Sequence, residues 1–198
     1  MRIHFILEPD SPGRFRDLGR LAEQLGFEAV WAPNILSARD PFLAFSLLAR
    51  ESRTIRMGPV AISPFELHPL KMANAVLTLN ELSGGRANLV VGGGGGTMIG
   101  MGLKPDRRAT HPRMVQGVRE CVEFLRAASP TTPLNFNGEL FQVQNYLPDW
   151  ATAPPPRLYV AANRPRMLKL AAELADGVML SDISLHHIAD TVATLRGG

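Results

Sequence analysis

Short apolar segments alternate along the chain with longer segments in which apolar residues recur at helical spacing. The run at 89–91 has no alternation, which is typical of a strand covered on both faces. In the segment 113–127, apolar residues recur every three or four positions, which is typical of a helix with one buried face. The same rhythm predicts strands at 3–7, 27–32, 55–62, 89–91, 158–161 and 177–180, and helices at 14–26, 41–48, 70–82, 113–127, 165–174 and 184–195. Strands that alternate with helices predict an α/β protein with a parallel sheet.

Five consecutive glycines, residues 92–96, directly follow the fourth predicted strand. Glycines leave no side chain where a backbone lies against a flat ligand, and ligands of parallel α/β folds bind at the carboxyl ends of the strands. A flexible loop is the alternative interpretation, but the position directly after a strand favours a ligand-facing loop.

Two architectures fit this order of elements, an open doubly wound sheet or part of a closed eight-stranded barrel. The loop after the first strand reads EPDSPG and carries no GxGxxG phosphate-binding motif. Because the glycines follow the fourth strand instead, the pattern favours the barrel.

Length and composition predict one globular domain over residues 1–198, with an irregular proline-rich excursion at about 129–156 that carries a short hairpin around Asn137 and Gly138. A net charge of +3 without a dense basic cluster does not indicate nucleic-acid binding. Cys121 is alone, so no disulfide framework is predicted, and no His, Cys or carboxylate spacing indicates a metal site. Without a signal peptide or a segment long enough to span a membrane, a cytoplasmic location is expected.

Several segments resemble one known family. NELSGGRANLVVGGGG is similar to a signature of the bacterial luciferase-like superfamily, and GFEAVWAPN, SPFELHP, GLKPDRR and YVAANRPRMLKLAAELADGVML resemble its deazaflavin (F420)-dependent methylenetetrahydromethanopterin reductases. The resemblance implies a (β/α)8 TIM barrel, of which this chain is expected to carry the first six βα units. It also implies a homodimer if the barrel is complete.

The resemblance further implies a flavin-type ring across the carboxyl face of the barrel. It places a non-prolyl cis peptide near Val60 and Ala61, in a bulge that supports the ring, and an anion site at the turn before the helix at 165–174. The residues carried over as cofactor-binding are Val60, Ala61, Ile62, Ser63, Gly92, Gly93, Gly94, Gly95, Ala161, Ala162, Asn163, Arg164 and Ser181.

The chain departs from the family pattern at its polar positions. Asn34 and Ile35 stand where the family has Asp-His after the second strand. The reductases' acid in the first strand corresponds to Ile6, with Glu8 one step along the same side, and an acid after the fourth strand is replaced by glycine or Thr97. Glu8 and Asn34 are therefore the candidate catalytic residues, Glu8 because a carboxylate at the barrel mouth can relay a proton.

The function expected from this resemblance is hydride transfer between coenzyme F420 and a small organic substrate. One alternative is an FMN-dependent monooxygenase of the same superfamily, and another, from a different class, is a non-catalytic fragment that binds a cofactor or a partner.

Overall fold

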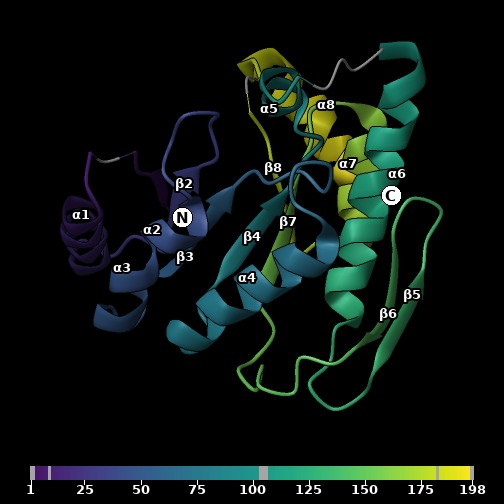
Figure 1. The fold of residues 1–198 in the computed structure, drawn as a ribbon. Coiled ribbons are helices and arrows are strands. Elements are labelled where there is room, and N and C mark those ends of the chain that lie inside the picture. Colours follow the sequence, from purple (N-terminus) through teal and green to yellow (C-terminus); the bar gives the residue numbers. More distant parts are fainter. Residues whose placement is uncertain (1–2, 9, 103–106, 182, 197–198) are drawn as a thin grey trace.

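The computed structural model describes residues 3–8, 10–102, 107–181 and 183–196, and it contains parallel strands with helices between them (Figure 1). The parallel strands are β1 (His4–Ile6), β2 (Ala29–Pro33), β3 (Arg56–Val60), β4 (Asn88–Val91), β7 (Arg157–Ala161) and β8 (Gly177–Met179). The helices are α1 (Pro12–Gln24), α2 (Pro41–Ala44), α3 (Ser46–Glu51), α4 (Pro69–Leu82), α5 (Gly95–Gly100), α6 (Arg107–Ala127), α7 (Pro165–Leu174) and α8 (Leu185–Arg196). The predicted α/β class with parallel strands is confirmed.

The parallel strands form two three-stranded sheets, with the orders β1-β2-β3 and β4-β7-β8. The sheets meet along β3 and β4, where isolated parallel bridges pair Met57 with Ala87 and Ile62 with Val91. Gly58 lies between these bridges, and its backbone approaches the carbonyl oxygen of Asn88 so closely that a Cβ on Gly58 would lie 1.8 Å from it. Because all six of these strands pair in parallel, their carboxyl ends face the same side of the molecule.

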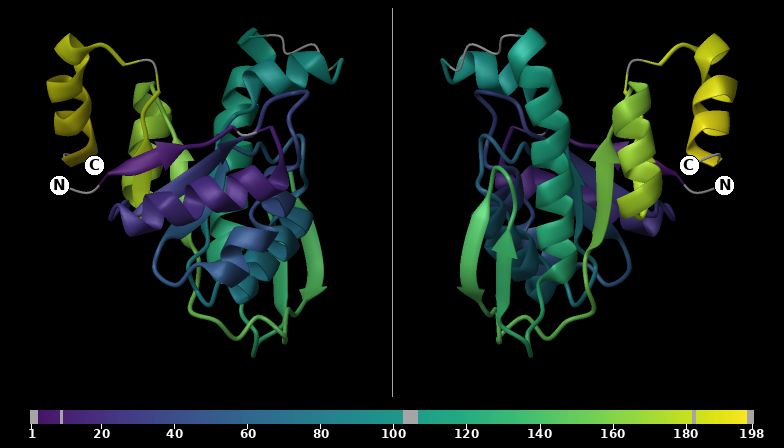
Figure 2. Two further views of the ribbon diagram at one scale, coloured as in Figure 1. Left: turned by 90° about the vertical axis from the view of Figure 1, so that its left-hand side faces the viewer. Right: turned by 90° about the vertical axis from the view of Figure 1, so that its right-hand side faces the viewer.

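The two faces of these strands pack differently. Side chains on the outer face join the large core that the strands share with α1, α3, α4, α6 and α7, the helices seen around the strands in Figure 2. On the inner face, the fully buried indole of Trp31 stacks edge-on against Tyr159 at 5.3 Å between ring centroids and donates its Nε1–H to His4 Nδ1 at 3.2 Å. One face covered by helices and an inner face filled by its own side chains is the packing of a barrel-type scaffold.

Two predicted elements differ from the sequence pattern. The predicted helix at 41–48 is interrupted at Phe45, so that α2 ends at Ala44 and α3 begins at Ser46. Phe45 is completely buried and packs edge-on against Phe15 of α1 at 4.8 Å between ring centroids. The break thus lies at the residue by which this segment is anchored in the core.

The predicted excursion contains a two-stranded antiparallel hairpin, β5 (Leu134–Asn137) and β6 (Gln142–Tyr146). The hairpin lies beside α6, at the end of the molecule away from α5 (Figures 1 and 2). Glu120 of α6, whose side chain is buried, accepts backbone N–H groups from Glu139, Leu140 and Phe141 in the hairpin turn. One carboxylate therefore fixes the excursion to the rest of the fold.

Glu23 of α1 likewise holds the loop between α3 and β3 by accepting hydrogen bonds from its backbone. Its Oε1 accepts the backbone N–H groups of Arg53, Thr54 and Ile55 at 2.6–2.9 Å and the Thr54 hydroxyl at 2.9 Å. Partial burial opposes ionisation of Glu23, but these donors together outweigh it and lower its pKa to about 2.

A lowered pKa of Glu23 makes the folded state sensitive to acid. Its stabilising effect is complete above the pKa of the unfolded chain, near 4.5, and is lost as the pH falls toward about 2. Replacing Glu23 with glutamine should lower the free energy of unfolding at pH 7 by about 1–2 kcal/mol after solvent screening and flatten its acid dependence, as measured by urea denaturation. Glu81→Gln, at an exposed position on α4, should change neither quantity.

Candidate functional site

The end of β3 and the end of β4 form a floor with very small side chains. The peptide bond between Val60 and Ala61 is cis, at the position that the family resemblance implied. Gly92 donates its N–H to the Ile62 carbonyl at 2.9 Å, and a Cβ on Gly92 would lie 3.1 Å from the Ala61 methyl and 3.3 Å from the Ala161 methyl. Gly92 is therefore packed directly against these two methyl groups, and only very small residues meet at this point where three strands end.

Ser63 connects the ends of β3 and β4 through its side-chain hydrogen bonds. The residue is completely buried, and its hydroxyl donates to the Gly93 carbonyl at 3.1 Å while it accepts the Phe65 N–H at 3.2 Å. Gly94 packs against it, with a backbone φ of +73° that favours glycine, and a Cβ there would lie 2.3 Å from the Ser63 Cβ. Gly94 is therefore required by its close contact with Ser63, whereas a Cβ on Gly93 would lie 2.8 Å from the end of the Met114 side chain.

The rest of the glycine run is not a loop. Gly95 and Gly96 form the first turn of α5, and a Cβ on either residue would meet nothing within 4 Å. The sequence pattern predicted a loop through all five glycines, but α5 begins inside the run. Among the predicted residues, Gly92, Gly93 and Gly94 lie with the bulge, whereas Gly95 faces open space.

Asn34 follows β2 and ties it to the bulge. Its backbone N–H donates to the Val60 carbonyl at 2.9 Å, and its Nδ2 donates to the Ala61 carbonyl at 3.4 Å and to Glu66 Oε1. Asn34 therefore acts on the backbone of the floor in this structure, and its predicted catalytic role stays a prediction.

Glu66 is a member of this cluster that the sequence analysis did not single out. It is half-buried, and burial raises the pKa of its carboxyl group, although the hydrogen bonds from Asn34 and from the backbone at Ser63 oppose the rise. One feature of the sequence could have identified Glu66 as a site residue: it lies in the SPFELHP segment, directly between the bulge and the start of α4.

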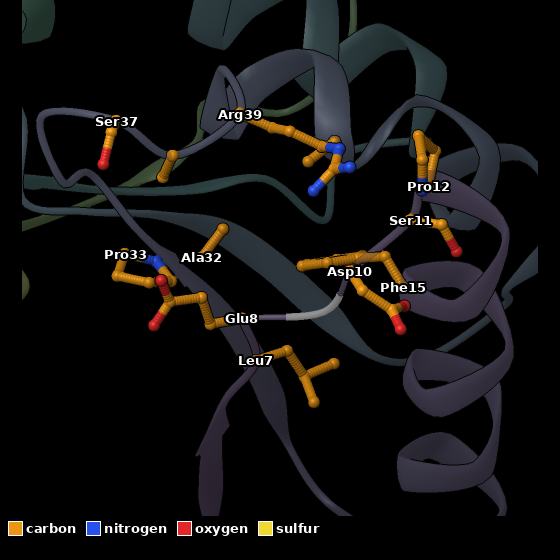
Figure 3. A pocket seen from close by; sticks show the side chains of 12 residues that line it. Leu7, Glu8, Asp10, Ser11, Pro12, Phe15, Ala32, Pro33, Ser37 and Arg39 are labelled. Carbon is orange, nitrogen blue, oxygen red and sulfur yellow. The ribbon is translucent and has the colours of Figure 1, made fainter.

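Glu8 lies at the end of β1, apart from the floor. Its exposed side chain lines a cavity of about 570 Å³ between the first β–α loop and the loop after β2, where Figure 3 shows its carboxyl group beside Pro33 and the Arg39 side chain reaching in from the opposite wall. Within the described part of the chain, no hydrogen bond or ion pair links Glu8 to the predicted cofactor-binding residues. Its catalytic role also stays a prediction.

A second cavity of about 530 Å³ lies between the start of α7 and α8. Asn163 Oδ1 accepts the backbone N–H of Ser181 at 3.2 Å, which joins the ends of β7 and β8, and Arg164 precedes α7 without capping it through its side chain. Among the described residues, no side chain caps the first N–H groups of α7 at this wall, as in anion sites at helix N-termini. Ala162, by contrast, is buried in the outer core rather than in the cavity wall.

Neither a metal-binding group nor an exposed thiol is found among the described residues. They contain no group of three His, Cys, Asp or Glu side chains placed to hold a metal ion, and none of their helices is long and apolar enough to cross a membrane. Cys121 is completely buried beside the Met72 sulfur, and burial raises the pKa of its thiol far above the usual range. A buried neutral thiol of this kind is a packing group.

Parallel strands with an outer layer of helices, together with small residues and two cavities at the carboxyl ends, define an α/β fold with parallel sheets and a candidate site at that end. The sequence from residue 4 to residue 198 matches the family described as Luciferase-like monooxygenase, and the chain belongs to this family.

Individual relatives agree with this assignment. The chain is 33% identical over 163 residues to a 5,10-methylenetetrahydromethanopterin reductase from Archaeoglobus fulgidus. The aligned region covers 82% of this chain and 47% of the relative. The solved structure of the coenzyme F420 dependent tetrahydromethanopterin reductase from Methanopyrus kandleri matches with a TM-score of 0.82 at 24% identity, over 98% of this chain and 59% of that one. A riboflavin lyase solved with modified FMN matches with a TM-score of 0.80 at 14% identity, over the whole of this chain and 58% of that one. The chain thus spans about half the length of the curated relative that it matches.

Proposed function

We propose that this chain binds coenzyme F420 at the carboxyl ends of its strands and takes part in hydride transfer between that coenzyme and a small organic substrate. The observation that carries the proposal is the position of the two cavities, beside Glu8 and at the start of α7, at the carboxyl ends of the parallel strands, with the small residues Gly92, Ala61 and Ala161 at the strand ends between them. The solved tetrahydromethanopterin reductase that shares this fold is described as coenzyme F420 dependent, which supports F420 as the coenzyme, and the family and the curated relative support an oxidoreductase.

The residues present fit such a coenzyme in two places. The floor would accept the flat ring, with Val60, Ile62 and Ser63 holding the bulge beneath it. The cavity beside α7 would accept the anionic side chain, held by backbone N–H groups and by Arg164, with Asn163 and Ser181 shaping the wall. When bound, the coenzyme supplies the hydride, and the protein supplies its orientation and shielding.

The proposal includes the finer description of the fold. These strands would be the first six βα units of a (β/α)8 barrel, with a homodimer formed by the complete barrel and a cytoplasmic location. FMN is the second candidate coenzyme, favoured by the structural match to a riboflavin lyase with modified FMN. A monooxygenase activity would then replace hydride transfer to an organic substrate.

Coenzyme titration with one matched pair of variants tests the proposal. Fluorescence titration of the protein with oxidised F420 should give saturable binding, and Arg164→Ala should weaken it about tenfold because a charge-assisted hydrogen bond to the coenzyme is lost. Lys169→Ala, an exposed change one turn into the same helix, should leave the dissociation constant unchanged. FMN binding with O2 consumption, in the absence of F420 binding, would favour the monooxygenase. Absence of binding to either coenzyme would contradict both functions, and binding without oxidation of reduced F420 by any tested acceptor would support a non-catalytic binding protein.

A further inference from the structure

The carboxyl group of Glu66 lies in an environment that does not suit a negative charge. Its Oε1 accepts a hydrogen bond from Asn34 Nδ2, but its Oε2 is buried and has no hydrogen-bond partner. Oε2 lies only 3.5 Å from where a Cβ on Gly94 would be, so the glycine backbone closes over it. An ionised carboxylate with one buried, unpaired oxygen is costly, whereas a protonated carboxyl group loses much less on burial.

The groups that the described residues place against Glu66 are neutral. They come from three elements: Asn34 after β2, Ser63 in the loop after β3, and Gly94 before α5. The nearest titratable side chain along the sequence is His68, which caps α4 by accepting the Leu70 N–H at Nδ1 and packs edge-on against Phe141 at 5.4 Å between ring centroids. No ion pair of Glu66 exists among the described residues, so nothing in them offsets a charge at this position.

Glu66 reaches the floor of the candidate site through one neighbour. Asn34 holds the carbonyl groups of both Val60 and Ala61, and the same Nδ2 that donates to Ala61 also donates to Glu66. The orientation of the Asn34 amide therefore depends on an acceptor at Glu66 Oε1. A change at Glu66 is transmitted to the backbone on which the ring would lie.

We propose that Glu66 is a positioning residue of the coenzyme site, whose carboxyl group orients Asn34 through Oε1 and thereby holds the Val60–Ala61 bulge in the shape that accepts the ring. This role rests on the proposed function, because it concerns the same site. A ring lying over the bulge and the glycines would shield Glu66 further from water. Coenzyme binding and protonation of Glu66 consequently favour one another.

Binding measurements over a range of pH test this role. The dissociation constant of F420 is measured from pH 5 to pH 9 for the wild type, Glu66→Gln, Glu66→Ala and the exposed control Glu139→Gln. Glutamine keeps the acceptor for Asn34 without the charge, so Glu66→Gln should bind as the wild type does at low pH and more tightly than the wild type at high pH. Since all the variants bind the same coenzyme, the ratio of their dissociation constants cancels the coenzyme's own ionisation.

The side-chain deletions separate positioning from general destabilisation. Glu66→Ala and Asn34→Ala should each weaken binding about tenfold, and the double variant should be no weaker than either one, because both remove the same hydrogen-bonded link. Additive effects in the double variant, or a ratio of wild type to Glu66→Gln that does not change with pH, would overturn the proposal.

The free energy of unfolding, measured without coenzyme, tests the protonation of Glu66 independently of the proposed coenzyme binding. Because burial raises the pKa of Glu66 in the folded chain, the stability it contributes is complete below the unfolded pKa and is lost as the pH rises through the folded pKa. The free energy of unfolding of Glu66→Gln relative to the wild type should therefore increase with pH, whereas Glu139→Gln should show no such trend. If this trend appears but neither coenzyme binds, the proposed function fails while the protonation of Glu66 stands. If a coenzyme binds and the trend is absent, the role of Glu66 is refuted alone.

Discussion

Replacing Gly58 with alanine is expected to prevent the chain from reaching its native structure. The added Cβ would lie 1.8 Å from the carbonyl oxygen of Asn88, and that oxygen belongs to the backbone of a fully buried strand. Neither strand can move away without breaking the bridges that join β3 to β4. The expected loss exceeds about 4 kcal/mol, a size reserved for severe disruption of the core. Soluble yield and urea denaturation monitored by circular dichroism measure it.

Gly13→Ala is the matched control for this experiment. Gly13 lies in the first turn of α1, where an added Cβ would meet nothing within 4 Å. Alanine has the higher helix propensity, so this change should leave stability unchanged or raise it by up to about 1 kcal/mol. A Gly58→Ala protein as stable as the wild type would show that β3 and β4 do not approach each other as described.

Replacing Glu120 with alanine is expected to release the β5–β6 hairpin from α6. The change removes a 2% exposed carboxylate and leaves the N–H groups of the hairpin turn without their acceptor, at a cost of about 2–4 kcal/mol. Burial opposes ionisation of Glu120, but its hydrogen bonds with Gln116 and the backbone of Phe141, Leu140 and Glu139 outweigh this effect and lower its pKa. Its stabilisation is therefore present above the unfolded pKa and is lost as the pH falls through the folded pKa.

Hydrogen exchange and urea denaturation check this expectation together. In Glu120→Ala the amides of residues 134–146 should exchange faster than in the wild type, whereas the strands β2, β3 and β4 keep their protection. Glu123→Ala, one turn further along α6, removes only an exposed ion pair with Arg119 and should cost less than about 1 kcal/mol. Equal effects of the two substitutions would contradict the role given to Glu120.

The elements that sequence could predict are those with a local cause. The parallel α/β order follows from apolar runs and helical spacing, and the glycines were placed correctly at the end of a strand. The sequence does not show why glycine is needed at position 94, because that need comes from the contact of Gly94 with Ser63, which follows a different strand. The interruption at Phe45 likewise depends on a partner in α1, which periodicity within 41–48 does not contain.

The polar part of the site was the least predictable. Asn34 and Glu66 are 32 positions apart in the chain, and Glu120 and Phe141 are 21 apart, so neither pair forms a motif. Only the fold brings their atoms together. Glu8 and Asn34 are predictable as polar residues that follow strands, but nothing in the sequence shows that Asn34 faces the β3 bulge while Glu8 faces a separate cavity.

The junction between β3 and β4 has a mechanical consequence. It is the seam of the sheet, since the ladder pairing within each half is replaced there by two single bridges. Ala61 belongs to one side of this seam, and Gly92 and Ala161 belong to the other. A molecule lying on these three residues would contact both three-stranded sheets, so the contacts that retain it would also hold the two sheets together.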